Sequence, residues 1–208
     1  MIWKKYLNIL LKAILGGLFI GIGGLAYLSI DNKILGALFF TIGLFTIVNF
    51  NLNLFTGKLC YVIENNNYYE VILTLLGNFI GTILLSIILR FINFSVQFDK
   101  VIALWNAKLN DSLISLFFKA ILCNILIYIA VDGFKNLKGF NKTLALFFGV
   151  MVFIICGFEH SIADMFYMNY ACQYDGESIL RLMIIVLGNV VGGIGIRFLH
   201  TRCQNEIS

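Results

Sequence analysis

Long apolar runs alternate with short polar segments over the whole of this 208-residue sequence. A helix that crosses the hydrocarbon core of a bilayer needs about 20 predominantly apolar residues. Six runs approach or reach that length, at residues 7–29, 34–55, 71–94, 113–131, 144–156 and 179–199. The pattern therefore predicts an all-α integral membrane protein with six transmembrane helices in a single domain over residues 1–208.

Two of the six runs contain polar residues where a lipid-facing helix would keep leucines. The second run passes through Asn49, Asn51 and Asn53 into LFTGK, residues 54–58. The fifth run is followed by GFEHSIADM, residues 157–165, which contains two acidic residues and a histidine. Backbone that leaves the helix at membrane depth must be buried in protein or line a water-filled cavity. We therefore predict that helices two and five are broken and that both breaks belong to a pore.

The chain also contains a short internal repeat. LGNFIGT at residues 76–82 recurs as LGNVVGG at residues 187–193, and an irregular segment precedes each copy. Two like halves with three helices each must insert in opposite orientations, as in the inverted repeats of many transporters. We assign the repeats to residues 7–94 and 113–199. The GxxxG spacing in both copies favours close helix packing in lipid.

The distribution of basic residues predicts the orientation. With six spans both termini lie on one side, and cytoplasmic loops are enriched in lysine and arginine. That side collects nine of the 15 basic residues, namely Lys4, Lys5, Lys12, Lys58, Lys135, Lys138, Lys142, Arg197 and Arg202. We expect a protein of the cell (inner) membrane with both termini in the cytoplasm.

Composition excludes several other classes of protein. Hydrophobic residues make up 60% of the chain and charged residues 12%, and the mean hydropathy is +0.92, which excludes an ordinary soluble enzyme. The net charge of +4 comes from scattered basic residues rather than a basic face, which excludes a nucleic-acid-binding chain. The five cysteines form no CxxC pair and no cluster with histidine, so the sequence indicates no metal or cofactor.

Several segments together resemble one family. GFEHSIADM closely resembles the GFEHSIANM signature of the formate/nitrite transporter family, and NLFTGK at 53–58 resembles the family's acidic-LFT loop. LGNVVGG resembles the glycine motif of the family's last helix, while NAKLND at 106–111 and FFKAILCN at 117–124 resemble its fourth-helix region. The matches follow the family order over nearly the whole chain.

The resemblance implies an aquaporin-like fold and a homopentamer. Each protomer would have its own pore for small monovalent anions such as formate, nitrite or hydrosulfide, in a channel rather than an enzyme. It places His160 at the centre of the pore, with the Thr56 hydroxyl pointing at it. It further implies that Lys108 attracts the anion at the outer mouth and that Asn124 and Asn189 are polar liners of the path.

Hydrophobic constrictions would lie on both sides of the histidine. The resemblance implies that Leu44 and Phe158 form the cytoplasmic constriction and that Leu54, Phe55 and Phe153 form the outer one. Such rings pass a neutral acid far more readily than a bare anion, which loses its hydration there. Because histidine titrates near neutral pH, His160 and a permeating anion could share one proton.

The chain departs from the family pattern at two positions. The acidic residue usual before LFT is Asn53 here, and the asparagine usual in SIANM is Asp164. If the two positions are close, a carboxylate has moved from one break to the other. The double substitution Asn53→Asp with Asp164→Asn would then preserve transport. For Glu159 we favour a structural role at the break, since an acid in the pore would repel anions.

Two other functions remain open from the sequence. One is a pore for neutral solutes such as water, urea or ammonia, although the chain lacks paired Asn-Pro-Ala boxes and has no proline at all. The other is a membrane enzyme that uses Glu159, His160 and Asp164 for acid–base chemistry or metal binding. A single histidine without a second ligand cluster makes the metal version weak.

Overall fold

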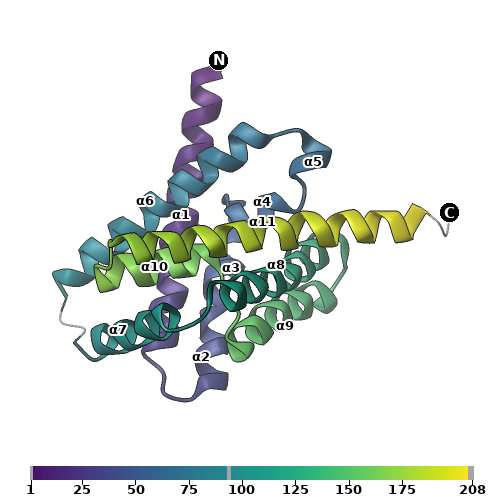
Figure 1. The fold of residues 1–208 in the computed structure, drawn as a ribbon. Helices are drawn as coiled ribbons and strands as arrows, with labels where there is room; N and C mark the ends of the chain where they lie inside the picture. Colours follow the sequence, from purple (N-terminus) through teal and green to yellow (C-terminus); the bar gives the residue numbers. More distant parts are fainter. Residues whose placement is uncertain (1, 93–94, 206–208) are drawn as a thin grey trace.

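The structure is a computed structural model that describes residues 2–92 and 95–205 (Figure 1). In these residues the chain is built from helices joined by short turns. In chain order they are α1 (Ile2–Leu28), α2 (Lys33–Phe40), α3 (Ile42–Asn49), α4 (Phe55–Leu59), α5 (Val62–Asn65), α6 (Tyr68–Arg90), α7 (Ser95–Leu109), α8 (Leu113–Asn136), α9 (Phe140–Cys156), α10 (Ser161–Ala171) and α11 (Gly176–Asn205).

Several of these helices are long and apolar enough to cross a membrane. Within the described ranges, α1, α6, α8 and α11 meet that condition singly, and α9 and α10 meet it together as a pair bent by 52°. The segment Lys33–Asn49, which comprises α2 and α3, is a shorter apolar stretch. The chain is thus a multi-pass membrane protein. The end of the predicted third span, residues 93 and 94, lies outside the described residues.

Helix α7 was not among the predicted elements. It follows α6 and packs against α10, and it contains Trp105, whose side chain is completely buried. The Trp105 indole N–H donates to Ser178 Oγ at 3.0 Å and so ties α7 to the start of α11. The last turn of this helix contains Lys108, one of the predicted site residues.

The four long helices pack as two closely related pairs. Helix α1 lies against α6, and α8 lies against α11 (Figure 1). A Cβ atom at Gly81 would lie 2.0 Å from the Ile14 carbonyl oxygen, and one at Gly192 would lie 2.3 Å from the Ile121 carbonyl oxygen. Glycine is therefore required at both crossings, because the two backbones touch there.

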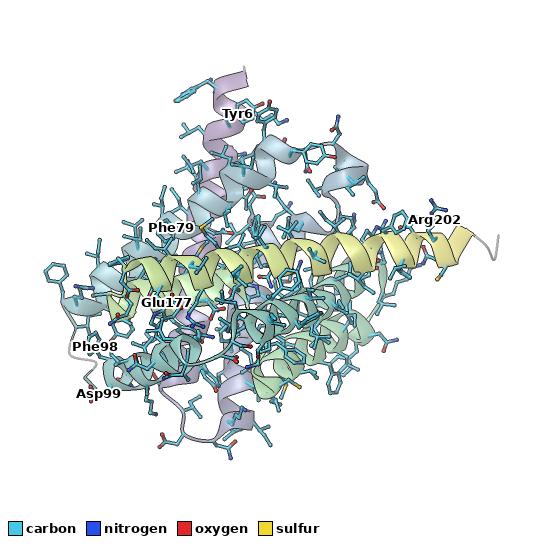
Figure 2. The ribbon with its side chains drawn as sticks, viewed as in Figure 1. Tyr6, Phe79, Phe98, Asp99, Glu177 and Arg202 are labelled. Atoms are coloured by element: carbon cyan, nitrogen blue, oxygen red, sulfur yellow. The ribbon has the colours of Figure 1, made fainter. Side chains whose placement is uncertain are left out.

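The outer surface of these helices is apolar. Large hydrophobic side chains project from α1 and α6, among them Tyr6 (Figure 2). Tyr69 is 82% exposed and Phe91 is 88% exposed. A soluble monomer rarely exposes so much contiguous apolar surface, so lipid or other membrane-embedded chains must cover it.

Substitution at the α8–α11 crossing tests this packing. We expect Gly192→Ala to destabilise the fold by about 1–3 kcal/mol, because the added methyl group has no space between the two backbones. The measurement is the thermal unfolding midpoint of the purified protein in detergent. Gly195→Ala on the same helix is the control, since no atom lies within 4 Å of a Cβ there; an equal loss in both variants would contradict the assignment.

Candidate permeation site

The two irregular segments end their helices in the same way. After α3, Asn51 has a left-handed backbone (φ 56°), and after α9, Gly157 does (φ 68°). The next amide then reaches back into the helix: Leu52 N–H donates to the Ile47 carbonyl and Phe158 N–H to the Phe153 carbonyl, each at 2.9 Å. This is a Schellman-type helix end. It leaves a few extended residues before α4 and α10 begin.

Asn78, on α6, pairs the free backbone groups at the first break. Its side-chain oxygen accepts from Phe55 N–H at 2.9 Å. Its side-chain nitrogen donates to the Asn53 carbonyl at 2.9 Å and to the Ala13 carbonyl at 2.7 Å. The Asn78 side chain is completely buried. One amide thus joins the break to α1 and satisfies groups that lipid could not.

Asn189, on α11, does the same at the second break. Its side-chain oxygen accepts from Ser161 N–H at 2.8 Å. Its side-chain nitrogen donates to the Glu159 carbonyl at 2.9 Å and to the Ala120 carbonyl at 2.8 Å. The repeated LGN motif therefore supplies a structural clamp in both halves. The sequence predicted that Asn189 lines the path. In the structure its side-chain oxygen and nitrogen both bind backbone groups.

Asn124 packs behind this clamp. Its side-chain nitrogen donates to the Asn189 carbonyl at 2.8 Å and to the Thr56 carbonyl at 3.3 Å. Its side-chain oxygen is buried and has no hydrogen-bond partner among the described residues. Asn124 therefore links α8 to both α11 and α4, with one acceptor left over.

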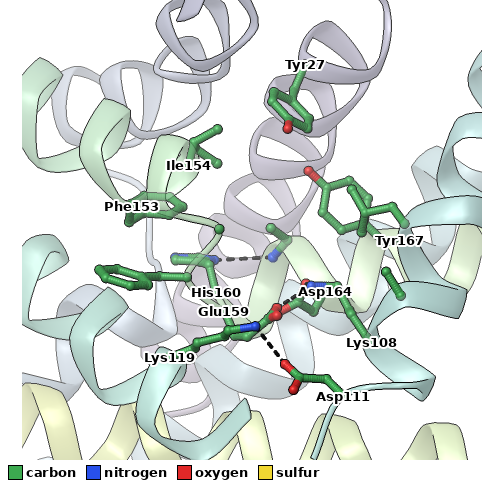
Figure 3. A pocket seen from close by; sticks show the side chains of 15 residues that line it. Tyr27, Lys108, Asp111, Lys119, Phe153, Ile154, Glu159, His160, Asp164 and Tyr167 are labelled. Atoms are coloured by element: carbon green, nitrogen blue, oxygen red, sulfur yellow. Dashed lines mark hydrogen bonds and ion pairs between the residues drawn. The ribbon is translucent and has the colours of Figure 1, made fainter. Parts of the chain in front are cut away.

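The two breaks meet at His160. Its ring is 2% exposed, and Nδ1 accepts the Ala163 N–H at 3.2 Å, which caps α10. Its Nε2 lies 3.0 Å from Thr56 Oγ1 on α4. Because Nδ1 is an acceptor, a neutral ring has its proton on Nε2 and donates it to Thr56. The Phe153 ring is stacked on the imidazole, 5.5 Å between centroids (Figure 3).

A cavity of about 250 Å³ opens beside His160; we call it the Lys108 cavity. The Lys108 ammonium contacts the Glu159 carboxylate and lies 2.9 Å from Asp164 Oδ1 (Figure 3). Glu159 is 4% exposed and Asp164 is 2% exposed. Phe153 and Phe158 also line this cavity. A single buried cation thus holds two buried carboxylates.

A second ion pair at this cavity went unnoticed in the sequence. Lys119 Nζ lies 2.6 Å from Asp111 Oδ2, and Ser115 Oγ donates to the same oxygen at 3.0 Å. The hydrogen bond from Lys119 holds the pKa of Asp111 below its usual value. Asp111 lies just before α8 and Lys119 lies eight residues further along the chain, beyond the spacing of three or four residues at which helical side chains are neighbours, so spacing alone does not identify the pair.

A second cavity, of about 680 Å³, lies on the α4 side; we call it the Leu44 cavity. Leu44, Leu54 and Gly57 line it, and Leu44 and Leu54 are themselves almost fully buried. Phe55 is also buried, but it is not among the described residues that line either cavity. This placement differs from the predicted grouping of Leu44 with Phe158 and of Leu54 with Phe55 and Phe153: the two leucines line one cavity, and Phe153 and Phe158 line the other.

Asn53 and Asp164 belong to different cavities. Asn53 lines the Leu44 cavity and donates to the Ile9 carbonyl at 3.1 Å, whereas Asp164 lines the Lys108 cavity and binds Lys108. The position that corresponds to Asn53 in the second half is Glu159, since both carbonyls accept from a clamp asparagine. The structure therefore gives no local compensation between Asn53 and Asp164, and the double substitution is not expected to restore a shared site.

Comparison with known proteins decides the family. A family model described as "Formate/nitrite transporter" matches residues 2–201. The chain belongs to this family. In the part of the chain that the structure describes, no group of three or more histidine, cysteine, aspartate or glutamate residues could hold a metal ion.

Relatives of the formate/nitrite transporter family match most of the chain. The formate-nitrite transporter of Plasmodium falciparum (isolate 3D7) is 28% identical over 231 residues, which cover 90% of this chain and 74% of that protein. The nitrite transporter NirC of Escherichia coli (strain K12) is 26% identical over 206 residues, 86% of this chain and 76% of that protein. These relatives are transporters and channels, which indicates a family of non-enzymes.

Solved structures share the fold. A chain titled "FNT family ion channel" superposes with a TM-score of 0.85 at 22% identity, covering 95% of this chain and 90% of that one. A chain titled "Pentameric formate channel with formate bound" gives 0.83 at 24% identity, covering 99% of each. The helical arrangement is thus that of known channels of the family.

The clamp at the second break can be tested by an isosteric substitution. We expect Asn189→Asp to destabilise the fold by about 2–5 kcal/mol, because it removes two N–H donors and sets a carboxylate against two carbonyl oxygens. The measurement is the thermal unfolding midpoint, together with the yield of monodisperse protein in detergent. Asn110→Asp is the control, since Asn110 is exposed, follows the end of α7 and donates only to the nearby Asn106 carbonyl. A normal midpoint for Asn189→Asp would show that the clamp does not support the break.

Proposed function

We propose that this protein is a membrane channel for small monovalent anions such as formate, nitrite or hydrosulfide. Membership of the formate/nitrite transporter family supports the general function. The observation that supports the mechanism is the hydrogen bond between His160 and Thr56. His160 lines the Lys108 cavity. Leu54 and Gly57, which lie close to Thr56 in the chain, line the Leu44 cavity. A solute that crosses between the cavities would pass this bond.

The proposed architecture is aquaporin-like, with two inverted repeats of three spans and broken second and fifth spans. The equivalent glycine crossings, helix ends and asparagine clamps of the two halves support it. An inverted repeat has its functional site near the midplane between its halves, and the contact between α4 and α10 lies between the two cavities. The exposed apolar helices, together with the pentameric title of a structural neighbour, support a homopentamer.

The proposed filter is hydrophobic on both sides of His160. Leu44 and Leu54 would narrow the path on one side, and Phe153 and Phe158 on the other. A bare anion in such a ring would lose several kcal/mol of hydration, whereas its neutral conjugate acid would lose much less. Transfer of a proton to the anion near His160 would therefore lower the barrier to permeation.

His160 is the proposed partner in this proton exchange. In the neutral ring Nδ1 accepts from Ala163 and the Nε2 proton faces Thr56. Donation from the neutral ring would leave an imidazolate, so the ring must first gain a second proton. We propose that the ring shares that proton with the permeating anion and returns to its capping tautomer afterwards.

The proposed orientation has both termini in the cytoplasm of a cell membrane. Ion pairs support two distinct charged rims. One rim contains Lys5 and Lys58 with Glu70, and Arg197 with Glu64; the other contains Lys100 with Asp31, and Lys119 with Asp111. The first rim holds both chain ends and most of the basic residues, as the positive-inside rule requires of the cytoplasmic side.

Reconstitution tests the function directly. Proteoliposomes that contain the purified protein are expected to take up formate, nitrite or hydrosulfide, and more so at acidic pH, where the permeating acid forms readily. Uptake is measured for each anion at two pH values, with acetate and lactate as competitors. Vesicle swelling in urea or ammonium solutions tests the neutral-solute alternative. Swelling without uptake of any anion would rule out the anion channel.

Replacement of the central ring tests its share in proton exchange. We expect His160→Asn to fold, because asparagine is an efficient helix N-cap and can accept the Ala163 N–H. The variant cannot titrate near neutral pH, so its anion uptake should lose most of its pH dependence. Normal assembly on size-exclusion chromatography is the control. Uptake with an unchanged pH profile would remove His160 from the mechanism.

A further inference from the structure

The cluster of Lys108, Glu159 and Asp164 contains two acidic side chains but only one basic side chain. The Lys108 ammonium contacts both carboxylates. The two acidic side chains are buried, and the lysine side chain is nearly buried. With both acids ionised the cluster would have a net charge of −1. Two carboxylates on one cation also repel each other, and a medium of low dielectric strengthens that repulsion. One bound proton makes the cluster neutral.

An unpartnered atom points to the same conclusion. Asp164 Oδ2 is buried and has no hydrogen-bond partner among the described residues, although Oδ1 of the same carboxylate is paired with Lys108. Asp164 lines the Lys108 cavity, and Figure 3 shows the Glu159 and Asp164 carboxyl groups converging on the Lys108 nitrogen. A bare carboxylate oxygen with no donor is costly when buried, whereas a neutral protonated carboxyl costs far less.

We infer that Glu159 and Asp164 together hold one exchangeable proton, and that this proton neutralises the anion in the Lys108 cavity before it reaches the Phe153 constriction. The transfer half of this inference rests on the proposed anion-channel function. The carboxyl O–H bond breaks, the anion gains the proton and becomes its neutral acid, and the negative charge remains on the carboxylate pair beside Lys108. A proton from the aqueous solution on the Lys108 side then re-forms the carboxyl O–H bond.

The neighbouring groups cannot take this role as readily. His160 also lines this cavity, but both nitrogens of the neutral ring are engaged, with Ala163 and with Thr56, so the ring has no spare proton for an incoming anion and exchanges one only with a solute that has reached the centre. Asp111 is paired with Lys119, so that pair is neutral without a proton. The other titratable or charged groups around the cluster come from α1, α8, α10 and α11 and are Tyr27, Cys123, Tyr167 and Arg181.

Infrared spectroscopy of the intact protein in lipid vesicles tests whether the proton is held. At neutral pH the wild type is expected to show the carbonyl band of a buried protonated carboxyl, which shifts in D₂O. Asp164→Asn and Glu159→Gln should each abolish the band, because a single carboxylate balances Lys108. Asp111→Asn is the matched control and should retain it. A wild type without the band, or a band that persists in Asp164→Asn, would overturn the inference.

Uptake by the same vesicles tests the transfer. Asp164→Asn should lower anion uptake at neutral pH about tenfold or more, through loss of a positioned proton donor, and flatten its dependence on pH on the Lys108 side. Unchanged uptake and pH profile in a variant that has lost the band would overturn the transfer step. Wild-type vesicles that take up no anion would instead overturn the proposed function, and the band would still decide whether the proton is held.

Discussion

The structure depends on one constraint, which is that backbone polar groups at membrane depth need partners within the protein. The irregular segments after α3 and after α9 each free several of them at once. In each half a single buried asparagine pairs with an N–H after the break, a carbonyl at the break and a carbonyl of a neighbouring long helix. The breaks are stable because Asn78 and Asn189 replace the helical hydrogen bonds that were lost. The glycines beside them allow the helix pairs to approach closely enough.

The two halves have the same backbone arrangement but present different side chains to their cavities. Leu54 and His160 occupy corresponding positions, since each precedes the helix that restarts after its break and each has an extended backbone. Asn53 corresponds to Glu159 in the same way. The first half thus presents leucine and an amide to its cavity, and the second presents an imidazole and a carboxylate. The imidazole and the carboxylates thus lie at the Lys108 cavity, whereas Leu44 and Leu54 lie at the other cavity.

The sequence was most informative about features that depend on residues close together in the chain. Hydropathy predicted helical segments close to those of the structure, and LFTGK and GFEHSIADM marked the irregular backbone. Helix α7 was missed because its apolar and charged residues do not form a long apolar run. The pairing of Lys108 with Glu159, just before α10, and with Asp164, on α10, joins residues about fifty positions apart in the chain, and no spacing rule reaches that far. The clamp role of Asn189 was likewise invisible, because an amide motif alone does not reveal its acceptors.

Asp164 changes how an anion channel of this kind can work. Two lysines line the Lys108 cavity, but both are already paired, and three carboxylates lie beside them. Among the described residues that line this cavity, no lysine is therefore left with an uncompensated positive charge that could attract an anion. An anion can lower its energy there only by displacing a carboxylate from a lysine or by gaining a proton. Displacement would leave a carboxylate buried without a cation, at a cost of several kcal/mol. Gaining a proton leaves every ion pair intact and also produces a neutral species, which loses less hydration free energy beside the Phe153 and Phe158 rings that line the cavity.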